Sequence, residues 1–151
     1  MTSRELTPDD CLEAFRAEIG ARAAGWWRLR DGGLELVAFA AAGDMLTQIA
    51  VDFMRATHSV ALSQTALGIV EAAVEGVVVV SRAEDLPPDE GSGLWLRRFG
   101  AARSVAVPVS VKGGGARRIV SVALGGPPPD DAEVASAIRM AAASWPETPI
   151  E

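Results

Sequence analysis

The sequence predicts an α+β domain built around one antiparallel β-sheet of five or six strands, with helices on both faces. Its strand-like segments are residues 25–30, 34–41, 77–80, 104–111 and 117–124. The first two and the last two are consecutive and are joined by short glycine-containing turns, which is typical of antiparallel hairpins. Segments with helical spacing precede, separate and follow these strands, so we expect the order α-β-β-α-α-β-α-β-β-α.

The chain is expected to open with an amphipathic helix that ends at Gly20. Thr7 suits the N-cap and Pro8 suits the first helical turn. Apolar residues then recur at helical spacing, at Leu12, Phe15 and Ile19. The first hairpin follows, and its Asp31-Gly32-Gly33 turn offers residues that tolerate the positive φ of a tight turn.

The middle of the chain is expected to alternate short helices with irregular segments. Helices are predicted over residues 44–55, 68–75 and 94–99. Gly76 suits the end of the second helix. Residues 56–67 show little periodicity and are expected to be largely irregular. Residues 83–93 are rich in proline and glycine and are expected to form a loop. The four valines at 77–80 are β-branched with no polar alternation, which favours a strand buried on both faces.

The end of the chain is expected to hold a hairpin and a last helix. Residues 112–116, which include three glycines, join the two final strands. Pro127-Pro128-Pro129 then interrupts regular structure, and Asp130 or Asp131 can cap the helix that follows. One face of this helix is predicted to consist of Val134, Ile138, Ala141 and Trp145.

Composition narrows the functional classes. The 151 residues suffice for a core, and we expect a single domain over residues 1–151. The formal net charge of −6 disfavours nucleic-acid binding, because an acidic surface repels the phosphate backbone. No apolar stretch approaches the roughly 18–20 residues that cross a bilayer, and no signal-peptide core is present, so we expect a cytoplasmic protein without a membrane partner. Cys11 is the single cysteine, so no intramolecular disulfide can form.

Three segments, taken in order, resemble a GAF domain over about residues 14–145. The first hairpin ends in Asp31-Gly32-Gly33-Leu34-Glu35-Leu36-Val37-Ala38, which is similar to the family's Asp-Gly turn and Leu-x-Leu-Val-Ala strand. Residues 67–80 resemble its Gly-Leu-hydrophobic helix, terminal glycine and buried strand. The third segment, Gly100-Ala101-Ala102-Arg103-Ser104-Val105-Ala106-Val107-Pro108, is similar to the signature in which Arg-Ser precedes a strand ending in Val-Pro.

The resemblance implies a GAF-like, PAS-related fold. Its N- and C-terminal helices would pack on one face of the sheet, and short helices and loops would cover the other face and enclose a ligand cavity. Some family activities are not matched: the free methionine sulfoxide reductases use several cysteines, and bilin attachment needs a cysteine and an Asp-Ile-Pro motif. The Asn-Lys…Phe…Asp-Glu pattern of cyclic-nucleotide GAF domains is also missing. We therefore expect no enzyme, no catalytic residues and no cofactor.

Six residues are the predicted ligand contacts: Trp26, Trp27, His58, Trp95, Arg103 and Ser104. The tryptophans could stack on a flat ligand or fill the core, and the adjacent pair must point to opposite faces of its strand. Arg103, in the Arg-Ser position of the signature, suits either a clamp on a carboxylate or phosphate or a structural ion pair. His58 could ligate haem axially or act as a base, but a lone histidine without partners is more often a polar loop residue, and a histidine-based metal site lacks a second histidine.

The expected function is a signal-sensing domain that binds a small molecule over the sheet and relays this through the terminal helices. Binding would order the loop over residues 83–93 as a lid. The alternative is a ligand-free protein–protein interaction module, with a homodimer seam formed by Val134, Ile138 and Trp145. In either case the expected partners are a second copy of the chain, bound through the terminal helices, and a signalling protein.

Overall fold

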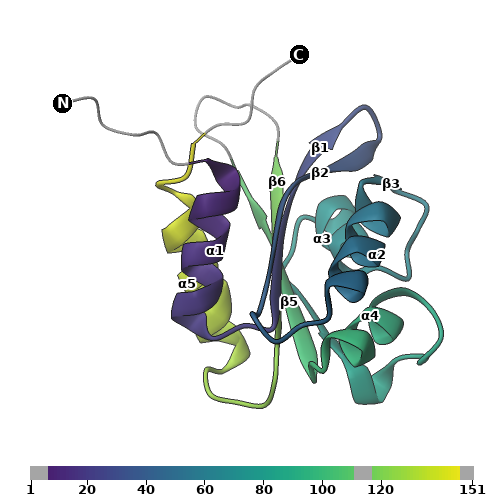
Figure 1. The fold of residues 1–151 in the computed structure, drawn as a ribbon. Helices are drawn as coiled ribbons and strands as arrows, with labels where there is room; N and C mark the ends of the chain where they lie inside the picture. Colours follow the sequence, from purple (N-terminus) through teal and green to yellow (C-terminus); the bar gives the residue numbers. More distant parts are fainter. Residues whose placement is uncertain (1–6, 111–116, 147–151) are drawn as a thin grey trace.

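The computed structural model describes residues 7–110 and 117–146, and these form an α+β domain around a six-stranded antiparallel sheet (Figure 1). The strand order is β3-β2-β1-β6-β5-β4. The strands are β1 (Ala23–Arg30), β2 (Gly33–Ala41), β3 (Ser59–Ala61), β4 (Val79–Arg82), β5 (Arg103–Val109) and β6 (Arg118–Leu124). The helices are α1 (Pro8–Ile19), α2 (Thr47–Thr57), α3 (Gly68–Glu75), α4 (Gly91–Phe99) and α5 (Asp131–Ala142), with one turn of 3₁₀ helix at Ala83–Asp85.

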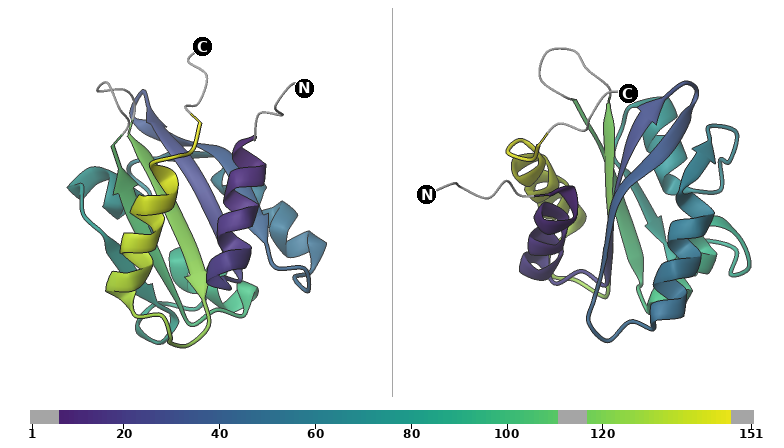
Figure 2. Two further views of the ribbon diagram at one scale, coloured as in Figure 1. Left: turned by 90° about the vertical axis from the view of Figure 1, so that its left-hand side faces the viewer. Right: turned by 45° about the horizontal axis from the view of Figure 1, so that its top comes forward.

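The sheet separates two layers of helices. The terminal helices α1 and α5 lie side by side on one face, while α2, α3 and α4 cover the other (Figures 1 and 2). Strands β1 and β6 are central, and each is paired on both sides. This arrangement confirms the predicted fold class. The predicted turn at residues 112–116 lies outside the described residues.

Local sequence signals set the ends of several elements. The Thr7 side chain accepts a hydrogen bond from the backbone N–H of Asp10 at 3.1 Å, and α1 ends at Gly20, whose φ is 73°. At α5 the cap is Asp130, which accepts from the Glu133 N–H at 2.8 Å. In the first hairpin, Asp31 adopts a φ of 49°, as the turn requires. The structure thus confirms these predicted boundaries. They could be predicted from the sequence because each is specified by a few neighbouring residues.

Two predictions about the edges of the sheet are wrong. The expected order of elements has no strand between residues 56 and 67, whereas residues 59–61 form β3 and pair with β2. The valine run is not a strand buried on both faces: β4 begins only at Val79, and Val77 and Val80 are 49 % and 36 % exposed. Successive side chains of β4 point to opposite faces of the sheet, and only those on one face, Val79 and Ser81, are buried.

Smaller differences concern helix limits. The second helix begins at Thr47 and not at residue 44, because Asp44 forms an ion pair with Arg22 at 2.5 Å instead. The proline-rich loop is shorter than expected, since α4 already begins at Gly91. Trp145 lies beyond the end of α5.

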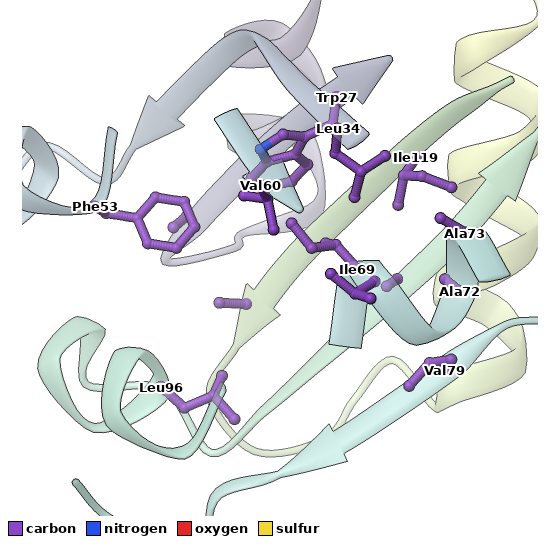
Figure 3. Packing of buried hydrophobic residues seen from close by; sticks show 14 of the residues in the cluster. Trp27, Leu34, Phe53, Val60, Ile69, Ala72, Ala73, Val79, Leu96 and Ile119 are labelled. Atoms are coloured by element: carbon purple, nitrogen blue, oxygen red, sulfur yellow. The ribbon is translucent and has the colours of Figure 1, made fainter. Parts of the chain in front are cut away.

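Two hydrophobic clusters, one on each face, hold the layers together. Under α1 and α5 the cluster includes Leu12, Phe15, Trp26, Val120 and Ile138. Under α2–α4 it includes Trp27, Leu34, Phe53, Ile69 and Ile119, and Figure 3 shows these side chains converging from helices and sheet. Strands β1, β2, β5 and β6 each contribute to both clusters, because successive side chains point to opposite faces.

The residues of the predicted dimer seam are used within the chain. Val134 and Ile138 are fully buried against the sheet. The Trp145 ring stacks on Trp26 with 5.1 Å between ring centroids. The seam as predicted is therefore wrong, because α5 has turned this face inward to cover the sheet. Dimerisation itself stays a prediction.

Among the described residues, no helix combines the length and the apolar character that crossing a membrane would require.

Cys11 is expected to react slowly in the folded protein. Its side chain is buried on α1, and burial raises the pKa of the Cys11 thiol, with the Asp10 carboxylate raising it further. Less thiolate is therefore present at a given pH, and reagent access is restricted. Labelling with Ellman's reagent at pH 8 should be at least about ten-fold slower in native protein than in guanidinium. Equal rates in the two conditions would contradict the described position of α1.

Candidate ligand-binding site

A cavity lies between the middle of the sheet and the helices α2–α4, and small side chains form its floor. These are Ala23, Gly25, Ser104, Ser121 and Ala123, from β1, β5 and β6. They share one face because Gly25 pairs with Ser121, and Ala123 pairs with both Ala23 and Ser104. Larger residues at these positions would fill the space, so the floor explains why a hollow exists here.

Aromatic side chains form the walls and roof. They are Trp27, Phe39, Phe53, Trp95 and Phe99. Phe53 of α2 is central to this group, with its ring centroid 5.1 Å from that of Trp95 and 5.0 Å from that of Phe99, both edge-on. Edge-to-face pairs of this kind are favourable geometries for aromatic rings. The helices α2 and α4 are thus joined above the cavity by interlocking rings.

Trp27 is fixed in the cavity wall by a hydrogen bond and by a close approach to the backbone. Its indole N–H donates to the carbonyl oxygen of Thr57, at the end of α2, over 3.0 Å. Its ring lies directly over Gly25, where a Cβ atom would overlap the indole. Gly25 is therefore required for close approach, because only a residue without a side chain leaves room for the ring.

The polar groups of the cavity are hydroxyls. Among the described residues, the hydroxyls of Ser104 and Ser121 on the floor have no hydrogen-bond partner. Neither hydroxyl oxygen is completely buried. Ser92, at the start of α4, accepts a hydrogen bond from the N–H of Gly68 at 2.9 Å and keeps its own proton to donate. No ionisable side chain is among the described residues that line the cavity. The cavity can therefore hydrogen-bond a ligand but cannot neutralise a charge.

The volume of the cavity is about 50 Å³. A buried water needs roughly 10–15 Å³ on this measure, so there is room for about three to five waters. A larger molecule requires a lining side chain to move. Trp95 is placed for this, because it is only half-buried whereas Trp27 is fully buried.

Three of the six predicted contact residues come together in this cavity: Trp27, Trp95 and Ser104. They arise from β1, α4 and β5. The expectation that Trp26 and Trp27 would point to opposite faces is confirmed by their places in the two separate hydrophobic clusters. The role of these three residues in binding a ligand stays a prediction.

The other three, Trp26, His58 and Arg103, lie away from the cavity. Trp26 is buried under α5, where the Arg118 guanidinium lies 4.8 Å from its ring centroid. His58 is exposed just after α2, and its carbonyl oxygen accepts a hydrogen bond from the Leu36 N–H at 3.0 Å. These positions remove the reason for placing Trp26 and His58 in the site.

Arg103 forms a structural ion pair, which was the alternative to its binding a ligand. Its side chain is 3 % exposed and points to the α5 face, opposite to that of Ser104. It contacts Asp131 at 2.5 Å and donates to the carbonyl oxygen of Pro129. Arg82 of β4 reaches the second oxygen of Asp131 at 2.5 Å. Arg103 therefore anchors the start of α5 to the sheet and does not clamp a ligand.

Sequence reasoning did not name Phe39, Phe53, Ser92, Phe99 or Ser121 as site residues. The aromatic residues are typical of any core, so no signal separates them from structural residues. Ser121 could be inferred only from the register of β6 against β5, because it is diagonal to Ser104 across that pair. The residue types between the two strands, which include three consecutive glycines, do not specify that register.

No protein-family model matches the sequence, and no curated protein sequence matches it. Solved structures do match. The type II free methionine-R-sulfoxide reductase of Thermoplasma acidophilum is similar with a TM-score of 0.55 and 13 % identity, over 87 % of this chain and 83 % of that one. The free methionine-R-sulfoxide reductase of Neisseria meningitidis gives 0.60 and 14 %, over 89 % and 70 %.

GAF domains are among the similar structures as well. A GAF domain/HD domain protein of Geobacter sulfurreducens matches with a TM-score of 0.60 and 15 % identity, over 92 % of this chain and 90 % of that one. At such identities the comparison establishes the fold alone. The chain has a GAF-like fold, which confirms the predicted resemblance.

The prediction that this chain is not an enzyme is contradicted by the comparison with solved structures. Two of the similar structures are free methionine-R-sulfoxide reductases, so enzymes share this architecture. The sequence argument against that one activity rested on Cys11 being the single cysteine. In the structure Cys11 lies on α1, across the sheet from the cavity. The position of Cys11 bears only on methionine sulfoxide reduction. It does not bear on catalysis by other side chains of the domain.

Proposed function

We propose, from the GAF-like fold as premise, that this domain senses a small molecule whose uncharged portion is held in the cavity between the sheet and α2–α4. The observation that carries the proposal is the lining itself: aromatic rings above, small residues below and unpaired hydroxyls on the floor. Apolar walls with a few convergent polar groups are typical of small-molecule sites. An uncharged group is favoured inside the cavity because burial of a charge without a partner is costly.

The proposed relay runs through β5. Ser104 faces the cavity, and its neighbour Arg103 faces the opposite side and anchors the start of α5 through Asp131. A ligand that displaces this part of β5 would alter the anchor of the terminal helix. This is a population shift between two arrangements of α5, and it requires the ligand to bind one of them more tightly.

The test uses 2-phenylethanol, which combines a ring for the aromatic walls with a hydroxyl for the serines. At a hundred times its dissociation constant, a ligand adds about 2.7 kcal/mol to the free energy of unfolding. For a chain of this size we expect the melting temperature to rise by about 5–10 °C. Native mass spectrometry of the purified protein should also reveal any molecule that is already bound.

Filling the cavity from its floor provides the control. Ser121→Val places two methyl groups in the space and removes a hydroxyl, so the shift in melting temperature with 2-phenylethanol should disappear. Ser136→Val, the same change on the exposed side of α5, should leave the shift intact. If 2-phenylethanol gives no shift and no small molecule is bound to the purified protein, the proposal is overturned.

A second candidate is the ligand-free interaction module, and the small volume of the cavity favours it. The side chains that line the cavity already occupy most of the space between sheet and helices. A protein–protein role would be supported by a defined oligomer in light scattering together with no response to Ser121→Val. A monomer at all concentrations would count against it. The cytoplasmic location stays a prediction under both proposals.

A further inference from the structure

A second hollow opens at the surface next to the cavity. It is lined by Ala56, Thr57, Ser63, Gln64, Thr65, Ala66, Leu67, Glu90, Gly91 and Trp95. Three of these residues, Thr57, Leu67 and Trp95, also line the inner cavity. The two hollows are therefore adjacent, and these three side chains separate them. The outer hollow differs in character, because hydroxyl and amide groups replace the aromatic rings.

The rim of the outer hollow is held by backbone contacts. The N–H of Ser92 donates to the carbonyl oxygen of Ala66 at 3.0 Å, and the N–H of Gly68 donates to the Ser92 hydroxyl at 2.9 Å. Gly91 has a φ of 56° and lies against Ala66 so closely that a Cβ atom would overlap it. The two sides of the rim are thus fixed together. An opening between the hollows must come from a side chain and not from separation of the rim.

Trp95 is the side chain that can provide this opening. It packs edge-on to Phe53 on its inner side, and the Arg98 guanidinium lies 5.3 Å from its ring centroid. Arg98 is in turn 3.5 Å from Asp52 of α2, and its side chain is 44 % exposed. Each of these contacts is modest by itself, since they are one edge-to-face aromatic pair, one cation–π contact and one exposed ion pair. Rotation of the indole would join the two hollows without disturbing either helix.

The size of the inner cavity shows why such a rotation matters. A cavity of about 150 Å³ can bind benzene. The inner cavity has about 50 Å³, which is too little for a ring while Trp95 stays in place. A ligand with a ring must therefore displace Trp95 toward the outer hollow, and its remaining atoms then extend into that hollow.

We propose that the outer hollow is the polar half of one extended site, which takes an amphiphilic amine with its uncharged ring in the inner cavity and its ammonium group beside Glu90. This inference rests on the proposed function of the inner cavity. Glu90 is the only ionisable side chain among the described residues that line either hollow. Its carboxylate has no hydrogen-bond or ion-pair partner among the described residues. A cationic end is thus attracted and an anionic end repelled.

The test compares three probes that share a phenyl ring and differ in charge: 2-phenylethylamine, 2-phenylethanol and 3-phenylpropanoate. Dissociation constants are measured by calorimetry on the full chain at low ionic strength. An exposed ion pair changes affinity by about two- to five-fold. We therefore expect the amine to bind about two- to five-fold more tightly than the alcohol, and the carboxylate to bind more weakly than the alcohol by a similar factor.

Two charge-neutralising variants locate the effect. Glu90→Gln should bring the amine and the alcohol to equal affinity and leave the alcohol unchanged. Asp89→Asn removes the same charge one residue away, at an exposed position outside both hollows, and should keep the preference for the amine. Both positions are exposed, so neither variant is expected to unfold.

The outcomes separate this inference from the proposed function. If the alcohol binds but the three probes have equal affinity, the extended site is overturned and the inner cavity is unaffected. A preference for the amine that persists in Glu90→Gln, or that is lost equally in Asp89→Asn, also overturns it. If 2-phenylethanol does not bind at all, both the inner cavity and the extended site lose their support.

Discussion

Replacing Asp131 by alanine is expected to lower the free energy of unfolding by about 3 kcal/mol. Removing one partner of a buried ion pair costs about 3–5 kcal/mol, because the other charge is left buried without compensation. Arg103 would be that charge: it is 3 % exposed and would keep only the carbonyl oxygen of Pro129. We place the expected value at the lower end because the Asp131 side chain is itself 29 % exposed. Urea denaturation of the variant and the wild type measures the difference.

The ion pair between Arg22 and Asp44 provides a matched control. Its N–O distance is also 2.5 Å, but the Asp44 side chain is 77 % exposed. Asp44→Ala should therefore change stability far less than Asp131→Ala, since solvent screens an exposed pair. Equal effects of the two variants would show that burial of Arg103 does not determine the cost. Asp131→Asn should be intermediate, because the amide oxygen can still accept from the guanidinium.

Replacing Gly25 by alanine is expected to lower the free energy of unfolding by about 2–4 kcal/mol. The new methyl group would occupy the position of the Trp27 indole, which is fully buried and hydrogen-bonded to Thr57. Overpacking of a core costs about 1–3 kcal/mol. Loss of the hydrogen bond adds about 1 kcal/mol. Chemical denaturation and the near-ultraviolet circular dichroism of Trp27 both report the change.

The double variant decides whether the indole is the cause. Trp27→Leu removes the ring and is itself destabilising, but it leaves space for a methyl group on residue 25. Adding Gly25→Ala to Trp27→Leu should therefore cost much less than adding it to the wild type. Residues in direct contact show such non-additivity, with coupling of about 0.5–3 kcal/mol. Strictly additive effects would contradict the placement of the ring over Gly25.

Much of the fold could be predicted because its signals are local. The caps at Thr7 and Asp130 and the turn at Asp31 are each specified by a few adjacent residues, and the structure confirms them. The edge strand β3 was missed for the opposite reason. It has three residues, and it is a strand only because Leu34 of β2 lies beside Val60.

The candidate site was predicted in part, and alternation along the strands explains which part. Arg103 and Ser104 are adjacent on β5, so they cannot both face one cavity. The same rule separates Trp26 from Trp27. The sequence does not show which residue of each pair faces inward, because that depends on the pairing of β1, β5 and β6 and on the helices that cover them.

The floor of the cavity has a consequence for how ligand preference can change. Its depth is set by short side chains, at residues such as Ala23, Ser104 and Ala123. The backbone of the strands that carry them is fixed, because β1, β5 and β6 are each paired with a strand on both sides. Exchanging one of them alters the space by a methyl or a hydroxyl group while the aromatic roof stays in place. A backbone of this shape can thus be retuned to molecules of different size in small steps, each of which leaves the packing of α1 and α5 on the far side untouched.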